Sequence, residues 1–352
     1  MKGIILHGGH GTRLRPLTHT GPKQLLPIAN KPMSQYCVET LSSAGIKQIA
    51  FIIGGIGSNK VKEYYGDGKK FGVKFTYIQQ DSPRGIAHAV SLCKDFIDNE
   101  KFVVFLGDNI IQRKINDYIL DFEKSNASAS LLLCEVDNPS QFGIAEIENN
   151  KIIKITEKPK NPPTNLAVTG IYFLTPYIFE VIKKLKPSWR NELEIADALQ
   201  ILVEEGKEII YGMITDFWKD TGTPNDIIEA NKIILENMPE LFQGKKEEDV
   251  IMEGKIIVGK GTIIKNGVNI VGPVIIGKNC IIEGSTIIGK NTSIGENSYL
   301  NDCKISDSII MSNCTINGKL DIKNSIIASN SKIVKDQNEK KFLLGEGTQI
   351  SL

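Results

Sequence analysis

An apolar residue recurs at every sixth position in the last third of the chain. The repeat runs without a break through Val258, Ile264, Ile270, Ile276, Ile282, Ile288, Ile294 and Leu300. Neither an α-helix, with about 3.6 residues per turn, nor a strand, with its period of about two, produces this spacing. A parallel β-helix does, because each hexad forms one flat face, three faces close a coil, and the apolar side chains stack from coil to coil. The repeat therefore predicts a β-helix of hexapeptide coils.

The repeat changes phase once, after the stretch NDCKISDS at residues 301–308. It slips by four residues and resumes at Ile310, Ile316, Ile322, Ala328 and Val334. The slip predicts a loop or a distorted coil at this point.

The sequence before residue 245 has a different rhythm, in which short apolar runs alternate with amphipathic stretches. We expect buried strands at 2–6, 48–55, 74–80, 101–109 and 128–136, and helices at 34–45 and 85–97. This alternation predicts a Rossmann-like α/β domain with a mostly parallel sheet covered on both faces. With the Lys/Glu-rich stretch 236–249 as linker, the predicted domains are residues 1–245 and 246–352, and a chain of 352 residues has room for about two domains.

The glycine-rich stretch HGGHGTRLRPLTHTGPKQLLP follows the first predicted strand, where a parallel sheet places ligand-binding loops. It lacks both the G-x-G-x-x-G fingerprint and the Gly-Lys-Ser/Thr end of a P-loop. Glycines at 8, 9 and 11 leave backbone N–H groups open to an anion, Arg13 adds a planar donor fork, and Lys23 adds a compact charge. The stretch indicates a cradle for phosphates, and the alternative is a turn followed by a solvated basic loop.

Two acidic residues follow apolar runs at the ends of predicted strands. Asp108 ends FVVFLGD, and Asp220 lies in FWKDTGTP. A carboxylate in such a place is costly unless it is paired or bound to a cation, and Mg²⁺ takes one or two carboxylates together with phosphate oxygens. The pair therefore predicts a shared Mg²⁺, although Asp220 could instead cap a helix that begins near Pro224.

Composition excludes several classes of function. The formal net charge is +1, which gives no long-range attraction for nucleic acid or an anionic membrane. Six cysteines without metal-ligand spacing, and no apolar run of about 18 residues, favour a reduced cytoplasmic protein. All four histidines precede residue 89, so the hexad region has no imidazole to serve as the base of an acetyl transfer.

These motifs together resemble the sugar-1-phosphate nucleotidylyltransferases, and most closely the long-form glucose-1-phosphate thymidylyltransferases with a C-terminal left-handed β-helix. Nine strings carry the resemblance in the family's order: GGHGTRLRPLT, PKQLLPIANKPM, QQDSPRGIAHAV, LGDN, FGIAEIE, EKP, AVTGIYF, NELEIADAL and WKDTGTP. They cover nearly the whole chain. His7 departs from the alanine that is usual in the family, and His10 and Lys219 occupy variable positions.

The resemblance implies a role for each matching residue. The nucleotide-binding set would be Leu6, Gly8, Gly9, Gly11, Thr12, Arg13, Gln80, Pro83 and Gly85, with Gln80 and Gly85 at the base. The sugar-phosphate set would be Asn109, Gly143, Glu157, Lys158, Val168 and Tyr172. The catalytic groups would be Arg13, Lys23, Asp108 and Lys158, and the Mg²⁺ ligands Asp108 and Asp220.

The implied reaction is a direct in-line attack of glucose 1-phosphate on the α-phosphorus of dTTP or UTP, with pyrophosphate as leaving group. The partners would be a nucleoside triphosphate and a sugar 1-phosphate, and the chain would form a homo-oligomer. A uridylyltransferase that acts on glucose or N-acetylglucosamine 1-phosphate is the main alternative. A bifunctional acetyltransferase and a non-catalytic regulator that binds sugar nucleotides are the others.

Overall fold

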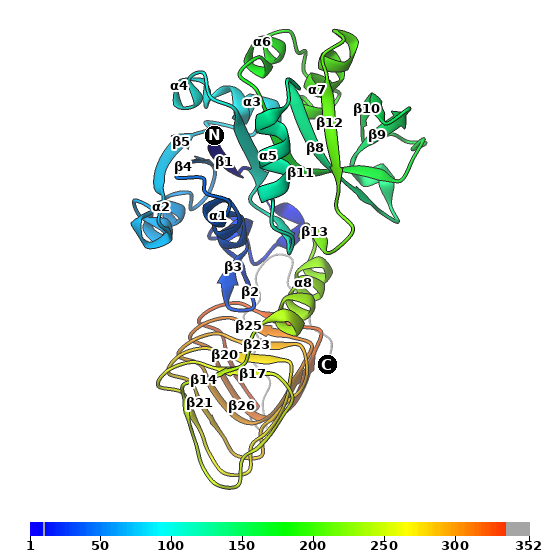
Figure 1. The fold of residues 1–352 in the computed structure, drawn as a ribbon. Coiled ribbons are helices and arrows are strands. Elements are labelled where there is room, and N and C mark those ends of the chain that lie inside the picture. The colour runs from blue at the N-terminus through cyan, green and yellow to red at the C-terminus, as the bar shows by residue number, and fades with distance from the viewer. Residues whose placement is uncertain (10, 336–352) are drawn as a thin grey trace. The chain divides into compact units, whose positions relative to one another are not determined.

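The computed structural model describes residues 1–9 and 11–335, which form two compact units (Figure 1). The first unit contains residues 1–9, 11, 18–25 and 33–220, and the second contains residues 12–17, 26–32 and 221–335. Two short segments from the start of the chain therefore belong with its C-terminal part. In the described residues no helix has the length and the apolar character needed to cross a membrane.

A nine-stranded sheet forms the centre of the first unit. Its strand order is β10-β9-β11-β6-β1-β4-β5, with β8 beside β11 and β12 beside β8. The strands are β1 Lys2–His7, β4 Gln48–Ile53, β5 Lys74–Gln79, β6 Phe102–Leu106, β8 Ala129–Glu135, β9 Gly143–Glu148, β10 Lys151–Glu157, β11 Leu166–Leu174 and β12 Ile209–Met213. The core β6-β1-β4-β5 is parallel, which confirms the predicted α/β sheet.

An antiparallel extension distinguishes this sheet from a purely parallel one. Strand β11 runs antiparallel to β6, β8 and β9, and β9 and β10 form a hairpin. The hairpin turns at Asn149 and Asn150, whose φ angles of 49° and 60° are those of a two-residue turn that asparagine tolerates. The sequence ENNK was therefore a hairpin signal that the strand pattern alone did not use.

Helices cover both faces of the sheet, and each face has its own apolar core. The helices are α1 Met33–Ser43, α2 Asn59–Tyr65, α3 Ile86–Ser91, α4 Lys94–Ile97, α5 Asn116–Lys124, α6 Ile178–Ile182 and α7 Ile195–Glu204. The predicted helix 85–97 is thus two helices separated at Leu92 and Cys93. The predicted strand 101–109 was also too long, because β6 ends at Leu106 and the chain turns away at Gly107 into β7, Asn109–Ile111.

The second unit is the predicted parallel β-helix (Figure 1). Every strand pair in its two sheets is parallel, and Val258, Ile276 and Ile294 stack at intervals of one coil. All eight residues of the uninterrupted hexad series are buried in its interior. Its strands are β14 Leu241–Phe242, β15 Lys245–Lys246, β16 Ile251–Glu253, β17 Ile256–Val258, β18 Ile263–Ile264, β19 Asn269–Val271, β20 Val274–Ile276, β21 Ile281–Glu283, β22 Ile287–Ile288, β23 Thr292–Ile294, β24 Tyr299–Ser306, β25 Ile309–Ile310, β26 Thr315–Lys323, β27 Ile326–Ile327 and β28 Lys332–Val334.

The phase slip is a distorted coil. After Leu300 the inward positions are Ile305 and Ile310, so two successive faces have five residues each in place of six. The register shifts between Asn301 and Cys303, around Asp302 with its φ of 53°. The predicted inward residues Ala328 and Val334 were wrong, because Ile327 and Ile333 stack on Ile310 and Ile316 in their place.

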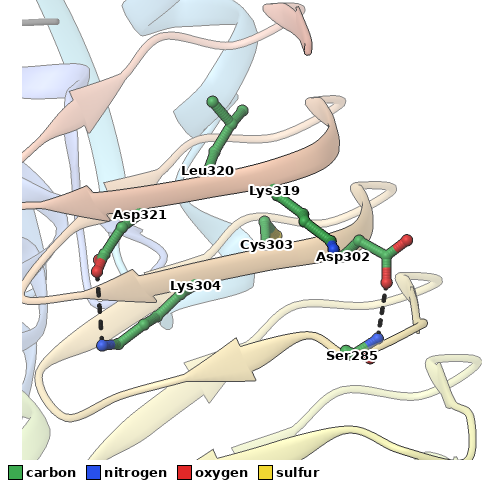
Figure 2. A pocket seen from close by; sticks show the side chains of 7 residues that line it. All are labelled: Ser285, Asp302, Cys303, Lys304, Lys319, Leu320 and Asp321. Carbon is green, nitrogen blue, oxygen red and sulfur yellow. Dashed lines mark hydrogen bonds and ion pairs between the residues drawn. The ribbon is translucent and has the colours of Figure 1, made fainter. Parts of the chain in front are cut away.

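The distorted coil leaves a shallow recess on the surface of the β-helix (Figure 2). Asp302 accepts a hydrogen bond from the Ser285 backbone N–H at 2.9 Å, and Lys304 lies 3.5 Å from Asp321. Both acidic groups therefore serve the coil itself.

Helix α8, Pro224–Asn237, and a hairpin of β2, Pro27–Ile28, with β3, Lys31–Pro32, complete the second unit. Thr223 caps the helix, since its hydroxyl accepts from the Asp226 N–H and Asp226 bonds back to the Thr223 N–H. The alternative that Asp220 caps this helix was wrong.

Candidate functional site

The glycine loop begins where β1 ends. Gly9 and Gly11 have φ angles of 94° and 58°, and a Cβ on Gly11 would lie 2.9 Å from the Thr18 side chain. Glycine is therefore required at Gly11 both by conformation and by space. The carbonyl of Gly8 accepts a hydrogen bond from the Gln24 amide at 3.0 Å, which fixes the start of the loop.

A buried ion pair lies at the end of β6. The Lys23 ammonium pairs with the Asp108 carboxylate, and the Asn109 amide donates to the same carboxylate at 3.1 Å. Burial alone would raise the pKa of Asp108, but the Lys23 charge and the hydrogen bonds from Lys23 and Asn109 outweigh it and lower that pKa. Asp108 is therefore held as a carboxylate in a largely dry environment.

Strand β13, Trp218–Asp220, brings the second acid to the same place. It pairs antiparallel with β7, and Asp220 lies opposite Asn109 in the register. The Trp218 indole N–H donates to the Asn109 Oδ1 at 2.8 Å. Of the two acids predicted to share a metal, Asp108 directly precedes β7, and Asp220 ends β13, the strand that pairs with β7. Trp218 is a positioning group that the sequence analysis missed.

The structure also shows how Gln80 is held after β5. The Gln80 amide nitrogen lies 2.9 Å from Nδ1 of His88, and a Cβ on Gly8 would lie 3.5 Å from its Oε1. Burial and the Arg84 charge lower the pKa of His88, which favours a neutral ring able to accept at Nδ1. Gln80 consequently presents its carbonyl oxygen toward the glycine loop. The orientation of the Gln80 amide and the tautomer of His88 both follow from the hydrogen bond between them.

Three of the predicted sugar-phosphate residues, Gly143, Glu157 and Lys158, lie at the open end of the β9–β10 hairpin. Glu157 lies opposite Gly143 in the register, and a Cβ on Gly143 would lie 3.2 Å from Glu157 Oε2. Burial raises the pKa of Glu157, and Lys158 lies 3.7 Å from its Oε1. The structure therefore brings together Gly143, Glu157 and Lys158, which come from two of the strings that carry the resemblance.

Arg190 is a cation at this cluster that the sequence analysis missed. Its guanidinium lies 3.4 Å from Glu157 Oε1 and 2.7 Å from Glu194 Oε2. Its signal was the string RNELEI, where Arg190 directly precedes a match used for the resemblance. Glu194 directly precedes helix α7, which starts at Ile195, so the helix holds the Glu194 carboxylate that pairs with Arg190.

Val168 and Tyr172 are both buried on β11. Gly170 lies between them, and the Asn109 side chain packs against it. A Cβ on Gly170 would lie 2.9 Å from the Asn109 side chain, so this glycine permits the close approach of β11 to β7. Val168 and Tyr172 pack in the apolar core, as does Leu6.

The remaining predicted nucleotide residues have varied surroundings. Pro83 is exposed, and Gly85 packs against the Leu193 backbone, which a Cβ there would meet at 2.4 Å. Thr12 and Arg13 are exposed on a short helix of the second unit, Thr12–Leu14, where a Cβ on Gly222 would lie 2.8 Å from the Arg13 guanidinium. His10 lies outside the described residues.

His7 points into an aromatic cluster. Its ring is edge-on to Phe51 at 5.0 Å and to Tyr65 at 6.3 Å, and its side chain is almost completely buried. Neither ring nitrogen has a hydrogen-bond partner among the described residues. Burial lowers the pKa of His7 from 6.5 to about 3, against a smaller opposing effect of Asp108.

This burial predicts an acid-labile fold. Between pH 6.5 and about 3 the unfolded chain binds a proton at His7 that the folded chain does not, so stability falls as the pH falls. We expect a loss of about 2–3 kcal/mol from this group between about pH 7 and 4.5. His7→Phe keeps a ring against Phe51 and should reduce this loss, whereas the half-buried control His19→Gln should not. Urea denaturation across this pH range measures both, and equal acid sensitivity of wild type and His7→Phe would contradict the prediction.

The described residues contain no group of three or more His, Cys, Asp and Glu side chains that could hold a metal ion by themselves. Asp108 is paired with Lys23, which lies next to Gly11 of the glycine loop, and Asp220 lies opposite the residue that follows Asp108. Such a set suits a substrate that brings phosphate oxygens of its own.

Comparison with known proteins gives consistent results along the chain. The family model described as nucleotidyl transferase matches residues 2–237, and the one described as GMPPB C-terminal domain matches residues 270–351. The chain is 41% identical to the low-salt glycan biosynthesis nucleotidyltransferase Agl11 of Haloferax volcanii, with all of both chains covered. It is 38% identical to a glucose-1-phosphate thymidylyltransferase of Streptomyces antibioticus, over 100% of this chain and 99% of that protein.

A solved structure resembles most of the chain. It is a Bacillus anthracis protein assigned as a glucose-1-phosphate thymidylyltransferase, with 42% sequence identity and a TM-score of 0.64. The match covers 69% of this chain and 98% of that one.

Proposed function

Because the chain belongs to the nucleotidyl transferase family, as a sugar-1-phosphate nucleotidylyltransferase, we propose that it transfers a thymidylyl group from dTTP to glucose 1-phosphate. The products would be dTDP-glucose and pyrophosphate. The observation that carries the proposal is the meeting of Lys23, Asp108 and the Asp220 strand beside the glycine loop. Positive groups and carboxylates in that arrangement are what the joining of two anions requires.

In the proposed reaction an oxygen of the sugar phosphate attacks the α-phosphorus of the triphosphate. The new P–O bond forms as the bond between the α- and β-phosphates breaks, and pyrophosphate leaves. The N–H groups of Gly8, Gly9 and Gly11 and the side chain of Arg13 would bind the triphosphate. Lys23 would offset the charge on the α-phosphate, and no covalent intermediate with the protein is needed.

The sugar phosphate would be held on the β9–β10 side of the sheet. Glu157, with its raised pKa, would accept hydrogen bonds from sugar hydroxyls. Lys158 and Arg190 lie 3.7 and 3.4 Å from Glu157, so two cations would lie beside the bound sugar phosphate, of which Arg190 is also paired with Glu194. Asn109, Gly143, Val168 and Tyr172 would shape the pocket around the sugar ring.

The arrangement fits Mg²⁺. Asp108, just before β7, and Asp220, on the strand paired with β7, would supply two hard oxygen donors, which is the usual protein share of a Mg²⁺ site bound to phosphate. When bound, the ion would neutralise charge on the phosphate oxygens. Asp108 would also keep Lys23 in place through their ion pair.

Two further properties are part of the proposal. All six cysteines are free thiols, which supports a location in the reducing cytoplasm. Assembly into a homo-oligomer remains a prediction.

Initial rates with glucose 1-phosphate test the choice of nucleotide. The proposal expects a higher kcat/KM for dTTP than for UTP. A clear preference for UTP would favour the alternative, a uridylyltransferase that acts on glucose or N-acetylglucosamine 1-phosphate.

The contact between Gln80 and His88 predicts how a pyrimidine is read. Uracil and thymine present an N–H donor at N3 where cytosine presents an acceptor, and Gln80 offers Oε1 because His88 holds its amide nitrogen. His88→Leu would free the amide to rotate, and the preference for UTP over CTP should fall about tenfold. The ratio of the two kcat/KM values measures this. Ser91→Ala, which removes a hydroxyl bonded to the His88 carbonyl, is the control, and an unchanged ratio in His88→Leu would refute the assigned role.

A further inference from the structure

One asparagine joins three segments of the second unit. Asn231 lies on α8 and has no exposed surface. Its Oδ1 accepts hydrogen bonds from the Ala29 N–H at 2.8 Å and the Ser293 hydroxyl at 2.6 Å. Its Nδ2 donates to the Asn291 carbonyl at 3.0 Å. The amide therefore connects the β2–β3 hairpin, α8 and the β-helix, which lie side by side in Figure 1.

The turn of the hairpin depends on these bonds. Ala29 and Asn30 have φ angles of 47° and 61°, and the left-handed conformation costs a non-glycine residue about 1–2 kcal/mol. Strained residues persist where surrounding contacts hold them. Ala29 is buried and bonded to Asn231, and the Asn30 side chain donates to the Ile294 carbonyl at 2.7 Å. The turn is thus fixed to β23 through side-chain amides from both sides.

The buried Asn231 amide does more than hold the hairpin and the β-helix together. An amide without its partners costs about 1–3 kcal/mol on burial, whereas apolar side chains would hold two surfaces together in several registers. Satisfied polar contacts specify one register. Asn231 therefore fixes the position of the hairpin on the β-helix, in addition to stabilising the contact between them.

The hairpin is close in sequence to the basic residues of the proposed reaction. Lys23 begins a short helix, Lys23–Leu25, and β2 starts two residues later at Pro27. The segment 12–17, which carries Arg13, also belongs to the second unit. If the hairpin became mobile, the segment that carries Lys23 would therefore become more mobile as well, because the two are adjacent in the chain.

We propose that Asn231 is a positioning residue that ties the β2–β3 hairpin to the β-helix and so holds the Lys23 segment in its catalytic position. The proposal rests on the proposed function and gives the β-helix a part in catalysis. Misplacement of a catalytic group by about 1 Å can lower the rate about 100-fold. We assign the effect to the triphosphate because the hairpin follows Lys23 closely in the chain, and Lys23 belongs to the proposed triphosphate site.

Two variants weaken the contact in different ways. Asn231→Asp keeps an acceptor for Ala29 and Ser293 but loses the donor to Asn291 and sets a charge against that carbonyl. Asn30→Gly removes the donor to Ile294 and relaxes the left-handed backbone, so it keeps the turn and should fold. Asn237→Ala, at the exposed end of the same helix, is the control, since Asn237 bonds the Ile233 carbonyl.

We expect both variants to lower kcat about 10- to 100-fold and raise the KM for dTTP, with the KM for glucose 1-phosphate unchanged. Asn237→Ala should match wild type. A general loss of structure would change both KM values together. Wild-type kinetics in folded Asn231→Asp and Asn30→Gly would overturn the proposal.

Hydrogen exchange tests the contact without any activity. The Ala29 amide should be strongly protected in the wild type, and exchange in residues 24–32 should accelerate in both variants while β1, β4 and β6 stay protected. An unprotected Ala29 amide in the wild type would overturn the proposal. Wild-type protein that is inactive with every nucleotide, yet protected at Ala29, would instead contradict only the proposed function.

Discussion

Replacing Arg13 by alanine should lower kcat by about 100- to 1,000-fold and leave the protein folded, because it removes a preorganised donor for charge that develops in the transition state. Arg13 is exposed, so its truncation opens no cavity in an apolar core. A Cβ on Gly222 would lie 2.8 Å from the Arg13 guanidinium, so the glycine at position 222 leaves room for this side chain. Steady-state kinetics and circular dichroism would measure the two effects.

Arg15→Ala is the matched control, since it removes a neighbouring exposed arginine with no role in the proposed reaction. It should change kcat by less than about fivefold. Arg13→Lys should recover only part of the lost rate, because an ammonium cannot present the planar donor fork of a guanidinium. Near-normal turnover by Arg13→Ala would remove Arg13 from the mechanism.

Replacing Asp108 by asparagine should have an effect of similar size on turnover and a second effect on stability. The variant loses a proposed metal ligand, and kcat should fall about 100-fold or more while the Mg²⁺ concentration for half-maximal rate rises. It also leaves the Lys23 ammonium, largely buried beside it, without this counter-charge. Removal of one partner of a buried pair costs about 3–5 kcal/mol, which urea denaturation would detect.

Asp81→Asn is the control for Asp108→Asn. Asp81 is an exposed carboxylate paired with Arg84 at 3.0 Å, and its replacement should leave turnover and stability close to wild type. Combining Asp108→Asn with Lys23→Gln should restore part of the stability but none of the activity, because the ammonium that lost the Asp108 counter-charge is gone while both proposed catalytic groups are missing. Retention of kcat within about fivefold by Asp108→Asn would contradict its role.

Much of the β-helix could be predicted because its signal is local and repeated. A residue such as Ile282 is inward for the same reason as Ile264 and Leu300, and the spacing alone identifies all three. The prediction became wrong where the spacing changed. The step from Ile322 to Ile327 has five residues, which moved Ala328 and Val334 out of phase, and only the stacking of one coil on the next identifies Ile327 and Ile333 as the inward residues.

The site could be predicted in its parts but not in its connections. The glycine loop follows β1, Asp108 follows β6 and Asp220 ends β13, and a position at the end of a strand is a local feature. The contact of Arg190 with Glu157 joins residues that are 33 positions apart, and that of Gln80 with His88 depends on the direction of α3 after Gly85. The place of residues 26–32 in the second unit depends on Asn231, which lies 202 positions after Ala29. Such contacts arise from tertiary packing, and periodicity carries no trace of them.

The most direct test of the proposed function is a screen for pyrophosphate release. Purified full-length protein with Mg²⁺ would be given each of dTTP, UTP, CTP, ATP and GTP together with glucose, galactose, glucosamine or N-acetylglucosamine 1-phosphate. We predict release with dTTP and glucose 1-phosphate, dependent on the presence of both substrates, with dTDP-glucose formed in equal amount. Absence of release from every pair would contradict the assignment of this chain as a sugar-1-phosphate nucleotidylyltransferase.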